Sequence, residues 1–134
     1  MTDLYVIRWL LQNTERQEHN IVWQQNINGI YFTNVNDGHN LVRVEIAAVS
    51  RPPRTIVRLF SNSLGEIQIQ EPLTVPFRKK YESEDDEILA KTIKYLFTVV
   101  SNKHATSELN EDERRQAIYK RLIFPDDTGK TVNL

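Results

Sequence analysis

The chain contains one short stretch that resembles a nucleotide-binding motif. Gly129-Lys130-Thr131 matches the end of a P-loop, in which backbone amides and a lysine hold phosphate groups. The motif also needs a glycine five residues before Gly129, where Phe124 stands, and a helix after the lysine, where only Val132-Asn133-Leu134 follows. We therefore predict no phosphate-binding loop here.

A second stretch, Asn36-Asp37-Gly38, resembles the middle of a calcium-binding loop. Aligning its glycine with that of the loop puts Thr33 and Val35 at the first and third ligand positions, and Val44 at the last, which requires glutamate. Val35 and Val44 have no side-chain oxygen to offer calcium, so we predict no calcium site here. The stretch is instead typical of a tight hairpin turn.

Histidines and clustered carboxylates could serve acid–base or metal chemistry. The three histidines, His19, His39 and His104, lie far apart and in no zinc-binding spacing. His39 beside Asp37 could be oriented as a base, but acid–base catalysis requires more partner groups than this pair offers, so we interpret His39 as a solvated turn residue. The acidic run at 84–87 is explained by the positive end of a helix dipole. We predict no catalytic residue, no metal site and no cofactor; the sequence favours a protein that is not an enzyme without settling the point.

Arginine and aromatic side chains form the most distinctive pattern. The residues that should share the outward face of three neighbouring strands are Arg43, Glu45, Arg54, Ile56, Arg58, Phe60, Glu66, Gln68 and Gln70. We take Arg43, Arg54, Arg58 and Phe60 as candidate binding residues, because arginine and aromatic residues are enriched at the centres of interfaces. The alternative is a solvated face of arginine–glutamate pairs across strands, each contributing less than ~1 kcal/mol.

Hydrophobic periodicity predicts the elements that would position these residues. Apolar residues at helical spacing predict a helix over 3–12, with Thr2 or Asp3 as its N-cap and Trp9 in the core. Alternating residues then predict strands that begin at 21–23 and cover 30–33, 41–49, 54–60 and 66–70. Short connections, including a type I′ turn at Asn28-Gly29 and a second turn at 36–38, indicate an antiparallel meander.

The last third of the chain is expected to be helical. Two prolines and no clear period predict a crossover loop over 71–81. Ser83 should cap a helix that reaches about Lys103, and Asn110 with Glu113 indicates a cap for a further helix that ends near Ile123. The fold class is therefore α+β: an N-terminal helix, about five antiparallel strands and two C-terminal helices, in one domain over 1–134 with a core over 1–124 and a tail over 125–134.

Composition limits the classes of partner and compartment. The chain of 134 residues has 17 Lys+Arg, 18 Asp+Glu and no cysteine, so one hydrophobic core suffices without disulfides or metals. The charge balances both in residues 1–70 and in residues 71–134, which makes nucleic acid an improbable partner. The first residues lack the pattern of a signal peptide and their apolar run is short, so we expect neither a signal peptide nor a membrane span. We expect a soluble cytoplasmic protein with no membrane association.

The order of elements also resembles a group of known domains. A leading helix over 4–14, a strand bearing Trp23, strands over 29–33, 41–46, 55–60 and 64–67, and a helix over 88–100 follow one another as in short, poorly characterised bacterial α+β domains, some of them linked to conflict systems. The resemblance covers about residues 4–100 and implies the same fold. The further helix near 111–123 departs from that pattern, and no functional residue can be carried over.

We therefore expect a small non-enzymatic protein–protein interaction module, regulatory or adaptor in kind, whose partner is another protein. Two alternatives stay open: an enzyme or small-ligand binder whose site is assembled from distant residues, and a toxin-neutralising or phage-encoded inhibitor. A homodimer joined through strand 66–70 is also expected to be possible, because this strand has neither proline nor lysine to discourage edge pairing.

Overall fold

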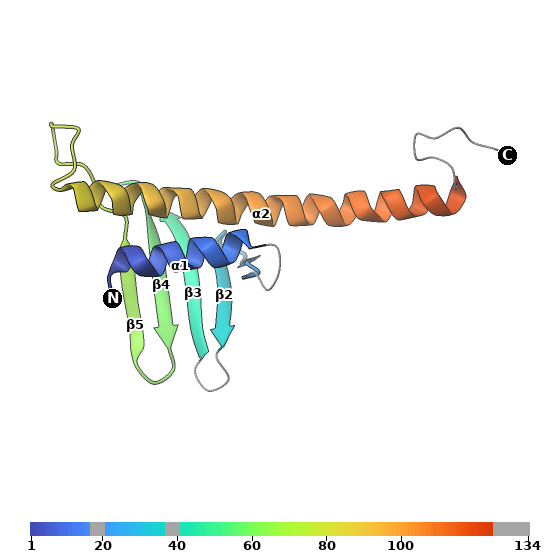
Figure 1. Ribbon diagram of the computed structural model, residues 1–134, viewed down its shortest axis with the longest axis horizontal. Helices are drawn as coiled ribbons and strands as arrows, with labels where there is room; N and C mark the ends of the chain where they lie inside the picture. Colours follow the sequence, from blue (N-terminus) through green and yellow to red (C-terminus); the bar gives the residue numbers. More distant parts are fainter. Residues whose placement is uncertain (17–20, 37–40, 125–134) are drawn as a thin grey trace. The chain divides into compact units, whose positions relative to one another are not determined.

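The computed structural model describes residues 1–16, 21–36 and 41–124 (Figure 1). The chain divides into two compact units, Met1–Asn102 and Lys103–Leu134. The sequence-based expectation of one domain over 1–134 stays a prediction. The expected tail over 125–134 lies outside the described residues.

Two helices and five strands make up the described structure. In chain order they are α1 (Asp3–Glu15), β1 (Gln24–Gln25), β2 (Tyr31–Asn36), β3 (Leu41–Val49), β4 (Arg54–Ser61), β5 (Gly65–Gln70) and α2 (Glu84–Ile123). The strands form one antiparallel sheet in the order β1-β2-β3-β4-β5. The predicted α+β class, with an N-terminal helix followed by a five-stranded meander, is confirmed.

Helix α1 begins at a polar cap and buries one side. The Thr2 hydroxyl accepts a hydrogen bond from the Tyr5 backbone N–H at 3.2 Å, which satisfies a donor that the helix itself leaves unpaired. Ile7 and Leu10 are almost completely buried. The prediction that Trp9 lies in the core is wrong: it is 41% exposed, because it falls between the buried positions of the helix.

The first strand is shorter and later than predicted. Ile21 donates its backbone N–H to Asn13 at the end of α1, at 2.9 Å, so the chain here is attached to the helix and not to β2. Trp23 then turns into the core, where its indole N–H donates to the buried Thr14 hydroxyl at 3.0 Å. Strand pairing therefore begins only at β1.

The turn between β1 and β2 also differs from the predicted type I′ turn. Of its two central residues only Gly29 has a positive φ, +80°, whereas a type I′ turn needs two. Gly29 donates its N–H to the Asn26 carbonyl at 3.0 Å, and the Asn26 side chain accepts from the N–H groups of Asn28 and Ile30. The asparagine side chain thus stabilises a longer loop. Of the second turn, expected at 36–38, only Asn36 lies within the described residues.

Helix α1 and the first half of α2 pack on the same face of the sheet. The main core consists of buried residues from α1, from the strands and from the first half of α2: Ile7, Leu10, Trp23, Val44, Ile46, Val57, Ile69, Ile93, Leu96 and Val100. The sheet residues among them are even-numbered on β3 and odd-numbered on β4 and β5. The strand register pairs these positions, so their side chains lie on one side of the sheet. The other face of the sheet therefore has no helix over it among the described residues of the first unit, Met1–Asn102.

One continuous helix replaces the two predicted C-terminal helices. α2 runs through the expected break near 104–110. This stretch contains neither glycine nor proline, so nothing in it forbids helical backbone, and one asparagine is too weak a signal to end a helix. Neither helix has, in its described residues, an apolar stretch long enough to cross a membrane.

The segment between β5 and α2 is a loop, as predicted. Within it Val75 and Lys80 form an isolated antiparallel bridge. Ser83 then accepts the Asp86 backbone N–H at 3.1 Å at the start of α2, so the hydroxyl caps the helix, and acidic residues occupy its first turn.

Candidate functional site

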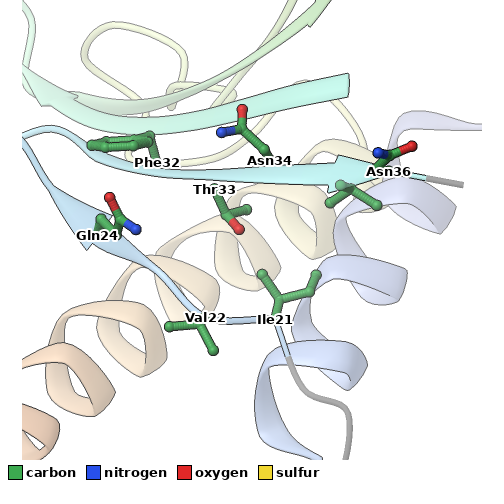
Figure 2. Close-up of a pocket in the computed structure, with 8 residues that line it drawn as sticks. Ile21, Val22, Gln24, Phe32, Thr33, Asn34 and Asn36 are labelled. Atoms are coloured by element: carbon green, nitrogen blue, oxygen red, sulfur yellow. The ribbon is translucent and has the colours of Figure 1, made fainter. Parts of the chain in front are cut away.

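One hollow lies beside β2 (Figure 2). Its volume is about 410 Å³, and its walls are Ile21, Val22, Gln24 and the β2 residues 32–36. None of these side chains titrates, so the hollow lacks a group for general acid–base catalysis. Its polar side chains are the amides of Gln24, Asn34 and Asn36 and the hydroxyl of Thr33, which could orient a polar ligand by hydrogen bonds.

The open face of the sheet is the second place that could bind a partner. We define it as the side chains on the side away from the helices: Phe32, Asn34, Arg43, Glu45, Ala47, Arg54, Ile56, Arg58, Phe60, Glu66, Gln68 and Gln70. Strand register arranges them in rows, of which Phe32–Glu45–Arg58–Gln68 and Asn34–Arg43–Phe60–Glu66 are the central two. The sequence-based placement of the arginines, Phe60 and the β5 residues on one face is thus confirmed.

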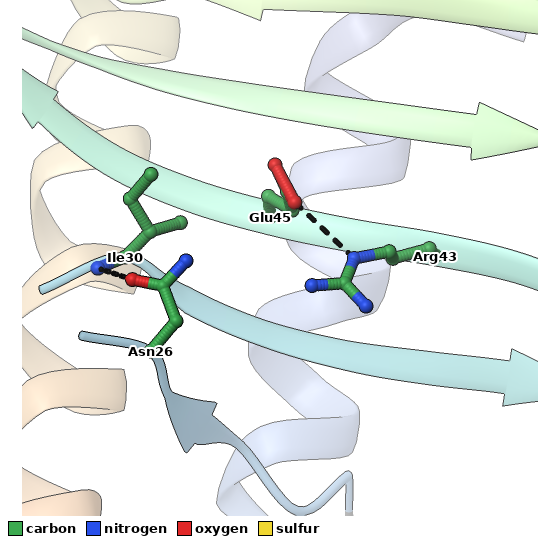
Figure 3. Close-up of polar contacts among 4 residues, drawn as sticks. All are labelled: Asn26, Ile30, Arg43 and Glu45. Carbon is green, nitrogen blue, oxygen red and sulfur yellow. Dashed lines mark hydrogen bonds and ion pairs between the residues drawn. The ribbon is translucent and has the colours of Figure 1, made fainter. Parts of the chain in front are cut away.

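Arg43 is held by two neighbours on this face, of which Figure 3 shows Glu45. Its Nε atom donates to Glu45 Oε2 at 3.2 Å, and its guanidinium carbon lies 4.2 Å from the centre of the Phe32 ring. Both contacts stabilise a cation, by charge and by the ring's negative face. The ion pair runs along β3, between residues two apart, and not across strands as the alternative interpretation expected.

Arg58 stands opposite Glu45 but has no such partner. Its Nε atom is buried and makes no hydrogen bond within the described chain. Glu45, the carboxylate that faces it in the register, is already bonded to Arg43. A buried donor without a partner is costly, because water has been removed from it without replacement. The Nε donor of Arg58 is therefore an unsatisfied polar group on the open face.

The other two candidate residues occupy different places on this face. Phe60 lies beside Arg43 in the register and next to Arg58 along the same side of β4. Arg54 is four residues from Arg58, about 13 Å along the strand, and donates to the Pro52 carbonyl at 3.0 Å. Ile56, only 5% exposed, lies between the two arginines. The structure therefore brings Arg43, Arg58 and Phe60 together and leaves Arg54 apart.

Sequence reasoning missed Phe32. The residue was assigned to a strand without being placed on the face, although alternation along β2 puts it opposite Glu45. With Phe60 it gives the open face two aromatic rings beside the arginines. Period-two counting from the buried Thr33 could have found it.

The one buried carboxylate among the described residues, Glu71, has a structural role. Its Oε1 atom accepts the Thr55 backbone N–H at 3.1 Å, and its Oε2 atom lies 3.4 Å from Lys94 Nζ. Burial lowers the pKa of Lys94, but attraction to Glu71 and Tyr81 and hydrogen bonds to both more than offset it, so the pKa lies above its ordinary value. The carboxylate is fully partnered and ties β5 to α2.

The remaining chemical candidates do not form a site. His19 and His39 lie outside the described residues, as do Asp37-Gly38 and Gly129-Lys130-Thr131. Tyr31 packs edge-on against Phe97 in the core, with ring centres 5.9 Å apart. Within the described ranges, no three His, Asp or Glu side chains are placed to hold a metal ion.

Comparison with known protein families, with curated proteins and with solved structures finds no match for this chain.

Proposed function

We propose that the chain is a small protein-interaction module whose open face binds an acidic segment of another protein. The observation that carries the proposal is Arg58: a guanidinium whose Nε atom is buried and unpaired on a sheet face that no described helix covers. A partner carboxylate could accept hydrogen bonds from it in the two-pronged geometry that arginine favours.

The surroundings of Arg58 suit such a contact. Phe60 lies beside it, and Phe32 is stacked under Arg43 one strand away. Ala47 and Ile56 leave an apolar, largely buried patch next to the guanidinium. Interfaces commonly place arginine and aromatic anchors in such apolar surroundings, where exclusion of water strengthens the charged contact.

The test uses partner capture with matched variants. The chain is immobilised and exposed to a lysate of the source organism, and bound proteins are compared between the unmodified chain and Arg58→Met, which keeps the aliphatic length and removes the charge. An exposed arginine on α1, Arg8, supplies the control Arg8→Met. We expect at least about tenfold weaker capture for Arg58→Met and for the Arg58→Glu, Phe60→Ala double variant.

The captured partner is then produced and titrated against the same variants in solution. Equal binding by Arg58→Met and the unmodified chain, with both folded by circular dichroism, would contradict the open face as the site. A partner that is a toxin or a host enzyme inhibited by this chain would make the module a neutralising or phage-encoded inhibitor, a narrower form of the same proposal. Loss of an uncharged small ligand on substitution of Asn34 would instead favour the hollow beside β2.

A further inference from the structure

Strand β5 forms one edge of the sheet (Figure 1). Among the described residues it pairs only with β4, and five of its six residues are exposed. Proteins usually protect such an edge with proline, lysine, a bulge or a covering element. β5 contains neither proline nor lysine, so its free hydrogen-bonding groups are available to another strand.

The direction of these groups follows from the pairing with β4. The backbone N–H of Glu71 donates to the Thr55 carbonyl at 2.9 Å, so odd-numbered residues here face β4. Because successive residues of a strand face opposite sides, the backbone groups of Glu66, Gln68 and Gln70 face the free edge. The next outward position, Pro72, has no N–H and ends the row of donors.

This row is complementary to itself in one register. If two copies of β5 pair antiparallel with Gln68 opposite Gln68, then Glu66 faces Gln70 of the second copy and all three outward positions are matched. That pairing forms about six backbone hydrogen bonds. A register shifted by two residues in one direction puts Pro72 opposite Glu66, and a shift in the other direction leaves Gln70 opposite the turn residue Leu64.

The side chains agree with the same register. Ile67, 61% exposed in the single chain, would lie opposite Ile69 of the second copy, so that apolar groups meet on the helix side of the sheet. On the open face, glutamate meets glutamine and glutamine meets glutamine, so no two like charges face each other. Both backbone and side chains therefore favour pairing without repulsion.

We propose that a second copy of this chain binds along β5, antiparallel and centred on Gln68, to form a homodimer with one continuous sheet. The twofold axis passes between the two Gln68 residues and places both open faces on the same side. The inference stands apart from the proposed function, since Arg58→Met should leave the dimer intact.

Single cysteines test the register directly, because the chain has no cysteine of its own. In Gln68→Cys the two α-carbons would lie about 5.5 Å apart, within disulfide reach. In the control Glu66→Cys they would be separated by about 13 Å along the strand, too far for a bond. We expect Gln68→Cys to form a cross-linked dimer under mild oxidation, and Glu66→Cys to do so only when mixed with Gln70→Cys.

Sedimentation of the unmodified full chain over a concentration series measures the dimer itself. Ile67→Lys, which places a charge at the predicted contact, should weaken the dimer at least about tenfold, whereas the control Ile27→Lys, at a fully exposed turn position, should not change it. A chain that stays monomeric, a dimer unaffected by Ile67→Lys, or cross-linking of Glu66→Cys as efficient as that of Gln68→Cys would each overturn the proposal.

Discussion

The two faces of the sheet use the same strands for different purposes. On the covered face, alternate residues such as Ile46 and Val57 are completely buried under the two helices. On the open face, their immediate neighbours along the chain include Glu45 and Arg58, which lie opposite each other and yet are not paired. Period-two alternation thus separates the residues that stabilise the fold from those that are free to recognise a partner.

The faces differ most clearly in how polar groups are satisfied. On the covered side, the Trp23 indole N–H has the Thr14 hydroxyl, and the Glu71 carboxylate has both Thr55 and Lys94. On the open side, the buried Nε of Arg58 has no acceptor among the described residues. An unsatisfied group that persists only on the uncovered face indicates that this face is not optimised for stability.

The largest expected effect is the loss of stability when a buried residue of the covered face is shortened. Ile46→Ala should lower the free energy of unfolding by about 2–5 kcal/mol, because it removes a completely buried side chain and leaves a cavity. The matched open-face truncation, Phe60→Ala, should lower it by much less, since Phe60 is only partly buried. Urea denaturation of both variants gives the comparison. Equal losses would show that the two faces contribute alike to stability.

The next effect concerns the polar group inside the covered face. Thr14→Val keeps the shape of the side chain but leaves the Trp23 N–H without an acceptor, so we expect a loss of about 1–3 kcal/mol in the free energy of unfolding. Thr98→Val is the control, because the Thr14 and Thr98 hydroxyls each donate to the carbonyl four residues earlier, but Thr98 lies exposed on α2. It should change stability by no more than about 0.5 kcal/mol. A Thr14→Val variant as stable as Thr98→Val would contradict this role.

Arg58→Met should act in the opposite direction on the open face. Replacing a guanidinium that has a buried, unpaired donor should leave stability unchanged or raise it by up to about 1 kcal/mol. The control Arg43→Met breaks an ion pair and a ring contact and should lower stability by about 0.5–1 kcal/mol. Thermal melts at low ionic strength measure both. Destabilisation by Arg58→Met larger than that by Arg43→Met would show that Arg58 is structural.

Much of the sheet could be predicted from the sequence, because alternation over eight or nine residues defines both the strand and its side. β3 has the predicted bounds, Leu41–Val49, and β4 and β5 each differ from theirs by one residue. β1 could not be predicted, since a long-range hydrogen bond from Ile21 to the end of α1 decides where it begins. The break expected in α2 depended on Asn110 and Glu113 alone, in a stretch that has no glycine or proline to interrupt the helix.

The location of the candidate site could be predicted from the sequence, but the pairing of its charged side chains could not. Register follows from the pattern, so the face and its arginines could be named in advance. The sequence could not predict which arginine pairs with Glu45, because Arg43 reaches this carboxylate along the strand and Arg58 faces it across the strands. That competition depends on side-chain geometry, and its outcome is what leaves Arg58 unpaired.

The smallest expected effect is a pH dependence that should come from the covered side alone. The pKa of Lys94 is raised above 10.5, with burial lowering it and the attraction of Glu71 and Tyr81 prevailing. A raised pKa in the folded state means that the lysine's contribution to stability is complete below pH 10.5 and is lost as the pH rises through the folded-state value. The arginines of the open face keep their charge throughout this range.

Urea midpoints measured from pH 8 to pH 11.5 for the unmodified chain and for Lys94→Met should therefore converge at the alkaline end. Lys91→Met is the control, because its partner Glu87 is 45% exposed whereas Glu71, the partner of Lys94, is only 5% exposed, and ion pairs in solvent add little to stability. Its difference from the unmodified chain should be small at every pH. A Lys94→Met difference that stayed constant up to pH 11.5 would contradict a contribution of the Lys94–Glu71 pair to folding that depends on the charge of the lysine.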